Sequence, residues 1–192
     1  MSRFSRTIAE RCFDEHPAAP EGEKLARYWL SLWRDDQLPL RAAFEPRKMG
    51  DLLRSLAIFD VVPGESVRCR LAGTFIVEGA GQDITGADWL AMTRPADRPV
   101  RLSRFSDVAN GAIGRGMRTA RRASGELQLC EEIMLPFADV APDGTRQVLT
   151  HIAWRPTLDN PTITGVSNMG GLLVGFQLAP LAKPAESRAR YG

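Results

Sequence analysis

The spacing of apolar residues predicts a helix and then a hairpin in the first half of the chain. Within residues 20–35 the apolar positions recur every three or four residues, as in a helix with one buried face. Residues 56–62 are almost all apolar, which predicts a buried central strand. Residues 67–71 alternate apolar side chains with arginines, and the turn at 63–66 joins the two strands into a hairpin.

The second half of the chain predicts one longer helix and then a series of strands. Residues 97–110 carry an apolar stripe at helical spacing, and the glycines that follow end this helix. Three strand-like runs come next, at 115–122, 127–137 and 147–155, and turn sequences separate them. Residues 172–178 form either a sixth strand or an extended packing segment.

The length of the chain, 192 residues, suits one domain with a sizeable core and less ordered ends. We expect a flexible N-terminal arm over 1–20, a single domain over 21–180 and a disordered, charged tail over 181–192. Within the domain, the expected parts are a helical flank at 21–54, a core at 55–155 and a C-terminal extension at 156–180.

Composition and charge argue against several classes of protein. The net charge of +2 produces no strong field for a polyanion, so a nucleic-acid partner is not expected. No apolar run approaches the length of a membrane helix, so no membrane partner is expected either. The three cysteines form no Cys-x-x-Cys pair and no disulfide framework, which favours a reducing, cytoplasmic location.

Several short motifs point to a family. They are Tyr28-Trp29, Phe44-Glu45-Pro46, Arg70-Leu71-Ala72-Gly73-Thr74 with Ile76, and Gly81-Gln82-Asp83-Ile84-Thr85-Gly86. Together with the order of the elements, they make residues 21–155 resemble a PAS domain, and in particular the stand-alone PAS-like proteins of alphaproteobacteria, long catalogued as a domain of unknown function. The resemblance implies an α+β fold: a five-stranded antiparallel sheet in the order 2-1-5-4-3, helices on one face around a small pocket, and an N-terminal flanking helix.

Members of the PAS superfamily sense small molecules, haem, flavin or light, or simply dimerise. The resemblance therefore implies a cytoplasmic sensory or regulatory domain that binds a small ligand and signals through dimerisation or contact with a signalling protein. The expected pocket residues are aromatic or apolar side chains, with one histidine, on the elements that should face it: Phe75, Ile76, Trp89, Phe105, Met134, His151 and Trp154. A register shift of one residue would exchange His151 for its neighbours.

The cofactor stays unassigned, and neither haem nor flavin is expected. His151 is the only histidine in the predicted fold and lies on a strand, whereas haem-binding PAS domains usually take their ligand from the helical side. A structural or hydrogen-bonding histidine is the preferred interpretation. Cys69 and Cys130 are predicted to be buried and inert, and the Asn-Cys motif of flavin-adduct domains is absent. No metal site is predicted.

Other polar residues have structural interpretations. Glu131 and Glu132 are neighbours on a strand and point to opposite faces, so they are no acid–base pair, and one is expected at an exposed edge. Thr74 is expected to cap a helix, and Asp83 and Thr85 to support a turn. The best basic patch is predicted to be a solvated sheet surface, with an anionic partner or nucleic acid as the alternative: Arg115, Arg118, Arg121 and Arg122.

The leading helix leaves two functions open. Tyr28, Trp29 and Trp33 either pack on their own domain or form the interface of a homodimer, because aromatic residues are enriched at interfaces. The interface belongs to an alternative function, a ligand-free dimerisation or adaptor module with a filled core. A third hypothesis, a small enzyme on a cone-shaped α+β fold, lacks a clustered acid–base pair, so no catalytic residue and no enzymatic activity are expected.

Overall fold

The computed structural model describes residues 4–15, 18–121, 127–154 and 173–182. The helices in this part of the chain are α1 (Arg6–Glu15), α2 (Pro20–Ser31), α3 (Thr74–Ala80) and α4 (Arg98–Ala109), with the 3-10 helices η1 (Arg41–Ala43), η2 (Pro46–Ser55) and η3 (Pro95–Asp97). The strands are β1 (Leu56–Val62), β2 (Ser66–Ala72), β3 (Ala112–Arg121), β4 (Leu127–Val140), β5 (Arg146–Trp154) and β6 (Leu173–Pro180).

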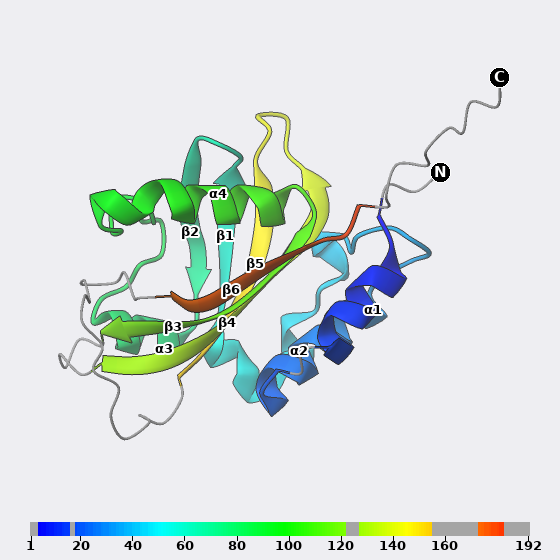
Figure 1. Ribbon diagram of the computed structural model, residues 1–192, viewed down its shortest axis with the longest axis horizontal. Helices are drawn as coiled ribbons and strands as arrows, with labels where there is room; N and C mark the ends of the chain where they lie inside the picture. Colours follow the sequence, from blue (N-terminus) through cyan, green and yellow to red (C-terminus); the bar gives the residue numbers. More distant parts are fainter. Residues whose placement is uncertain (1–3, 16–17, 122–126, 155–172, 183–192) are drawn as a thin grey trace.

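The strands form one antiparallel sheet in the order β2-β1-β5-β4-β3-β6 (Figure 1). The first five strands have the order that the family resemblance implies, which confirms the α+β fold. The sixth strand pairs with β3 along Ala112↔Pro180 to Arg118↔Leu173, so the extended segment near 172–178 is a strand. The sheet is therefore one strand wider than the resemblance implies.

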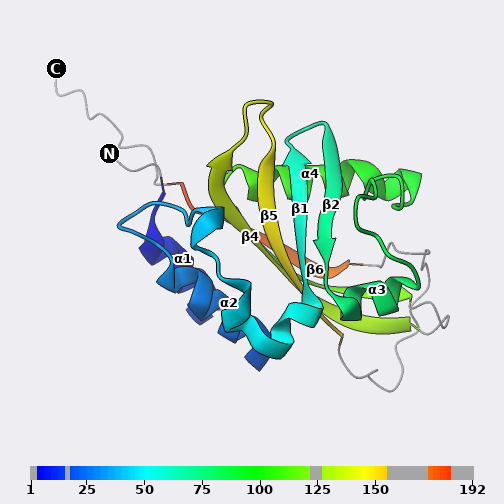
Figure 2. The same cartoon turned by 180° about the vertical axis from the view of Figure 1, so that it is seen from behind.

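Helices cover both faces of this sheet. Alternate residues of a strand point to opposite faces, and directly opposed residues of neighbouring strands share a face. One face carries Phe59 and Met134 and is covered by α3 and α4; we call it the α4 face. The other face carries Ile58 and Leu149 and lies under α2 and η2; we call it the α2 face. The two opposite views show α4 on one side of the strands and α2 on the other (Figure 1 and Figure 2).

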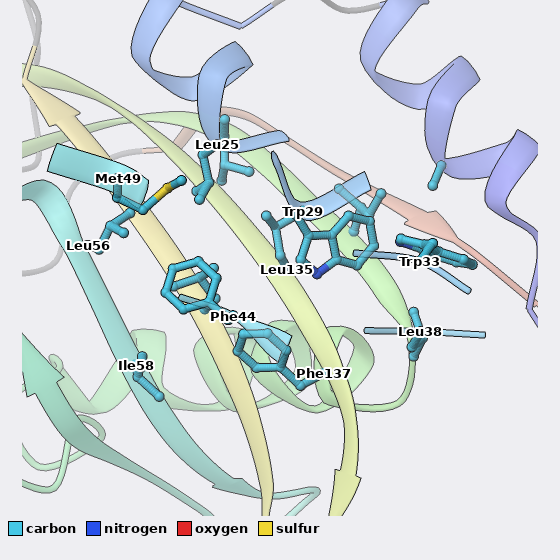
Figure 3. Packing of buried hydrophobic residues seen from close by; sticks show 14 of the residues in the cluster. Leu25, Trp29, Trp33, Leu38, Phe44, Met49, Leu56, Ile58, Leu135 and Phe137 are labelled. Atoms are coloured by element: carbon cyan, nitrogen blue, oxygen red, sulfur yellow. The ribbon is translucent and has the colours of Figure 1, made fainter. Parts of the chain in front are cut away.

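The core of the α2 face is built around Trp29. Its side chain is fully buried, its indole N–H donates a hydrogen bond to the carbonyl of Pro136 at 3.1 Å, and Trp33 meets it edge-on at 5.3 Å between ring centroids. Phe44 and Phe137 lie beside each other in the same cluster (Figure 3). The helical stripe predicted from the sequence is therefore the face that α2 buries against the sheet.

The predicted flexible arm is wrong over much of its length, because α1 occupies Arg6–Glu15. Ion pairs one turn apart support this helix, Arg6 with Glu10 at 2.8 Å and Arg11 with Glu15 at 3.5 Å. Ala9 is fully buried in the α2-face core, and both views show α1 and α2 side by side (Figure 1 and Figure 2). Few large apolar residues mark this packing in the sequence.

The first and last described residues of the chain meet in a short antiparallel pairing, in which Phe4 lies opposite Ala182. Ser5 N–H donates to the carbonyl of Leu181 at 2.9 Å, and Leu181 is fully buried although it belongs to the predicted disordered tail. The rest of that predicted tail, from residue 183 onward, lies outside the described residues.

The corner before α3 depends on a glycine rather than on a threonine cap. Gly73 is the residue before the first turn of α3, and no side chain caps that turn, so the predicted capping role of Thr74 is wrong. A Cβ on Gly73 would collide with the backbone carbonyls of Leu53 and Arg54. The predicted turn after α3 is confirmed, because the Asp83 carboxylate accepts a hydrogen bond from the Thr85 N–H at 2.8 Å.

Candidate functional site

A row of mostly small residues crosses the middle of the α4 face. The strand register places Ala57 opposite Thr150, Thr150 opposite Met134, and Met134 opposite Gly114. Two of the four side chains in this row are therefore absent or reduced to a methyl group. The Thr150 side chain lies on the α4 face of the sheet, between Ala57 and Met134.

The next row on the same face carries a buried acid. Glu132 lies opposite Ile152 on β5 and opposite Gly116 on β3. Glu132 is buried, although the sequence predicts one of the two adjacent glutamates at an exposed edge. Arg104 of α4 is close enough for electrostatic interaction with Glu132, while its own burial lowers the pKa of its guanidinium. The site thus holds one acidic and one basic side chain, Glu132 and Arg104, whose formal charges cancel.

Aromatic rings form the part of the site nearest β1. The Phe59 ring lies 4.9 Å from the Phe105 ring and 5.4 Å from the Trp89 ring, measured between centroids. The guanidinium carbon of Arg101 lies 5.2 Å from the centre of the Trp89 ring. The rings bring together a strand, the loop after α3, and α4, and they give this end of the site an apolar, polarisable surface.

Two buried polar atoms in this layer stand out. Within the described residues, neither the Thr150 hydroxyl nor the Trp89 indole N–H has a hydrogen-bond partner. Thr150 is 0% exposed and Trp89 is 5% exposed, so solvent does not satisfy them. Leaving a buried polar group unsatisfied costs about 1–3 kcal/mol. A molecule that offers an oxygen or nitrogen acceptor would satisfy either group.

The predicted pocket residues divide between the two faces. Ile76, Trp89, Phe105 and Met134 all belong to the buried cluster of the α4 face. Phe75 lies on α3, is half-buried and is not part of the cluster. The backbone of Trp154 ends β5, but its side chain lies outside the described residues.

His151 lies on the opposite side of the sheet from the predicted pocket. It pairs with Leu56 and Ile133, which belong to the α2-face core, and it lies close to Gly22 of α2. It therefore lies on the face opposite to Ile76, Trp89, Phe105 and Met134. The sequence alone does not fix the strand register to within one residue. Thr150, its neighbour, lies on the α4 face instead.

A second group of buried polar residues lies on the α2 face with His151. Both carboxylate oxygens of Glu131 accept a hydrogen bond from the Ala19 N–H, at 3.3 Å, at the start of α2. Arg115 donates to the carbonyl of Cys12 at 3.3 Å and lies over the Phe13 ring at 5.5 Å. Burial lowers the pKa of Arg115, and the nearby Glu131 opposes this effect.

Arg115 is thus not part of a solvated basic patch, because it is only 9% exposed. The side chains of Arg118 and Arg121, and all of Arg122, lie outside the described residues, so the rest of that predicted patch stays a prediction. The buried guanidinium instead joins α1 to the sheet, through its hydrogen bond to Cys12.

The proposed interface residues of the leading helix lie largely inside the protein. Trp29 and Trp33 are buried in the α2-face core, so they pack on their own domain. Tyr28 is half-buried, and its hydroxyl accepts a hydrogen bond from the Glu45 N–H at 2.9 Å. The tyrosine therefore links α2 to the segment that precedes η2.

The three thiols are expected to differ in reactivity. Cys69 and Cys130 are fully buried, and burial raises the pKa of Cys69 to about 11. Cys12 is half-buried; burial raises the pKa of its thiol, and Arg115 opposes this effect. We expect Ellman's reagent to modify only Cys12 in the native protein, faster as the pH rises, and all three thiols after denaturation. Rapid modification of a second thiol in the native protein would contradict this packing.

Across the described ranges, no three or more His, Cys, Asp or Glu side chains come together in a group that would hold a metal ion. In that part of the chain, no helix combines the length and apolar character needed to cross a membrane.

The sequence of this domain matches one known protein family over most of its length. A family model described as the PAS domain matches residues 18–152, more than half of the chain. The chain belongs to the PAS domain family. PAS domains are commonly sensory modules and are typically not enzymes. The narrower assignment to stand-alone alphaproteobacterial proteins stays a prediction.

Two solved structures are similar to this PAS domain. A variant of RsLOV is 16% identical with a TM-score of 0.40; the match covers 57% of this chain and 66% of that one, just under two thirds of its length. The PAS domain of an HTR-like protein from Haloarcula marismortui is 18% identical with a TM-score of 0.36, and the match covers 54% of this chain and 86% of that one. No curated protein matches the sequence.

Sequence reasoning missed three residues of this site, namely Thr150, Glu132 and Arg104. The alternation along β5 contained a signal for the first, because Thr150 shares its face with Val148 and Ile152. No pattern in the sequence marks the approach of Arg104 to Glu132, which lie on different elements and come together only when α4 packs on the sheet.

Proposed function

We propose that this PAS domain is a sensory or regulatory module that binds a small, mainly apolar ligand on the α4 face of its sheet. The observation that carries the proposal is the buried Thr150 hydroxyl, which has no hydrogen-bond partner among the described residues. The Trp89 indole N–H is a second buried donor in the same layer. A ligand that accepts hydrogen bonds from both would remove the penalty of burying them.

The surroundings favour a ligand without net charge. Glu132 and Arg104 balance each other in formal charge, and Phe59, Phe105 and Met134 supply apolar contact. A flat or aromatic molecule with a carbonyl, ether or ring-nitrogen acceptor fits this combination of groups. The proposal assigns no catalytic residue and neither haem nor flavin.

The output of such a domain would leave through protein contact. We propose that the ligand changes dimerisation or the docking of a signalling protein, and that the protein acts in the cytoplasm. The cysteines of the described residues are free thiols, which supports a reducing compartment. A homodimer would use surfaces other than Trp29 and Trp33, because both are buried in their own protomer.

The experiment compares native and denaturing mass spectrometry of freshly purified protein and of a Thr150→Val variant. We expect the wild-type protein to carry a small molecule that is released on denaturation. We expect the fraction of protein that carries this molecule to be at least 10-fold lower in the variant. Valine has nearly the shape of threonine, so the ligand-free variant should be no less stable than the wild type. If the Thr150→Val variant carried the small molecule to the same extent as the wild type, Thr150 would not be the residue that binds the ligand by a hydrogen bond.

A ligand-free adaptor is the second candidate, and the packing of Phe59 against Phe105 and Trp89 favours it. In that case the rings themselves fill the space between the sheet and α4. The wild-type protein would then show only the polypeptide mass. Thr150→Val would raise the free energy of unfolding by about 1–3 kcal/mol, since it removes an unsatisfied hydroxyl.

A further inference from the structure

The outer side of the α1–α2 pair is hollowed. A groove of about 470 Å³ runs between the two helices, and its apolar floor is formed by Phe13 of α1, Ala18, and Ala26 and Leu30 of α2. The two helices lie side by side in both views of the fold (Figure 1 and Figure 2). On α2 the lining residues recur from Glu23 to Leu30 at helical spacing, next to the stripe that packs on the sheet. We call this hollow the α1–α2 groove.

The rim of the α1–α2 groove is acidic. Glu10 and Asp14 of α1 face Glu23 of α2, and Arg27 is the single basic residue of the lining. Arg6 pairs with Glu10 at 2.8 Å, and Arg27 pairs with Glu23 at 3.6 Å. The three carboxylates and these two guanidinium groups give the rim a net formal charge of −1, whereas the whole chain carries +2. The groove therefore combines an apolar floor with a charge opposite to that of the rest of the protein.

Helix α2, which forms one wall of the groove, is attached to the sheet by hydrogen bonds and close packing. Glu131 on the sheet binds the N–H of Ala19 at the start of α2, and Trp29 is anchored to the Pro136 carbonyl. Gly22 of α2 packs so closely on the sheet that a Cβ there would lie 2.6 Å from the Ile133 Cδ1 atom. Binding in the groove therefore requires no separation of α2 from the sheet.

We propose that the α1–α2 groove is a docking site for a basic amphipathic helix of another protein. Apolar side chains of that helix would lie on Phe13 and Leu30, and its lysines or arginines would pair with Asp14. They would also compete with Arg6 for Glu10 and with Arg27 for Glu23. Charge complementarity selects this occupant, because an acidic or uncharged segment gains nothing from the rim. This site lies away from the α4 face, so the inference is independent of the proposed ligand.

The size of the groove suits a short helix. Helix α1 contains 10 residues and is therefore about 15 Å long. A partner helix of about three turns would lie along it and present apolar residues at i, i+3 and i+7. Because the floor is only half-buried at Phe13 and Leu30, the partner would cover apolar surface that is now partly exposed to solvent.

The test uses the 192-residue protein and two labelled peptides, an amphipathic helix of leucine and lysine and its counterpart with glutamate in place of lysine. The groove variant carries Glu10→Gln, Asp14→Asn and Glu23→Gln. The matched control carries Glu15→Gln, Glu21→Gln and Glu45→Gln, which changes the net charge equally at exposed positions outside the groove. Fluorescence anisotropy measures binding, and circular dichroism verifies that each variant is folded.

We expect the lysine peptide to bind the wild-type protein and the control variant, and the groove variant at least 10-fold more weakly. We also expect binding to weaken as salt is added and the glutamate peptide not to bind. Equal binding of the lysine peptide to the groove and control variants would overturn the proposal. A wild-type dimer that becomes monomeric in the groove variant would overturn it too, because a second copy would then be the occupant.

If the triple variant fails to fold, the single variant Asp14→Asn and its control Glu15→Gln answer the same question. Asp14 is exposed, so its replacement leaves the packing of α1 intact. We expect a smaller, two- to five-fold loss of lysine-peptide binding for Asp14→Asn and none for Glu15→Gln. Equal affinity of the two single variants would count against the groove.

Discussion

Replacement of Trp29 by alanine is expected to lower the free energy of unfolding by about 3–5 kcal/mol, the usual range for a buried tryptophan. The side chain is fully buried at the centre of the α2-face core, and its N–H is bound to the Pro136 carbonyl. The change would leave a cavity between α2 and the sheet and leave that carbonyl without its donor. Chemical denaturation followed by circular dichroism measures the effect.

The control for this prediction is Trp29→Phe. Phenylalanine keeps an aromatic ring on the core but cannot donate the hydrogen bond, so we expect a smaller loss of about 1–2 kcal/mol. Size-exclusion chromatography with light scattering on both variants distinguishes core from interface. If Trp29→Ala kept the stability of the wild type but changed the oligomeric state, the placement of Trp29 in the core of its own protomer would be wrong.

Glu131→Ala is expected to be the second most harmful change, with a loss of about 3 kcal/mol, because it removes a buried hydrogen-bonded charge. The carboxylate accepts from the first turn of α2 and lies near the buried guanidinium of Arg115. Without it, the Ala19 N–H loses its acceptor and the arginine loses a compensating charge. Amide hydrogen exchange should show α1 and α2 losing protection before the rest of the domain.

The matched control is Glu132→Ala, one residue further along the same strand. Glu132 is equally buried but lies on the α4 face, next to Arg104. Its removal should loosen α4 and leave the protection of α2 unchanged. If both variants lost protection in the same helices, the assignment of the two glutamates to different faces would be incorrect.

The elements of the fold could be predicted because each carries its own local pattern. The apolar run of β1 and the alternation of β2 specify strands without knowledge of their neighbours, and the motif order suggested the family. The sheet order followed from the family resemblance and not from the pattern. Helix α1 was missed because Ala9 is its one fully buried residue, while its larger apolar side chains Ile8 and Phe13 are only half-buried against the core.

The site was less predictable because it depends on which face each residue points to. Alternation along β5 separated Thr150 from His151 correctly, but it did not say which set faces α4. An open sheet would expose one set, and polarity would then settle the question. Here helices cover both faces, so Thr150, His151, Glu131 and Glu132 are all buried, and polarity gives no guide.

Because helices cover both faces, the central strands separate two buried layers of side chains. Thr150 belongs to the layer on the α4 face and His151 to the layer on the α2 face, although their Cα atoms are only about 3.8 Å apart. Glu131 and Glu132 are divided in the same way on the adjacent strand. A backbone shift at either pair of neighbours displaces one side chain in each layer at the same time. A substitution at any of these four buried positions that moves the backbone therefore disturbs the packing on both faces of the sheet.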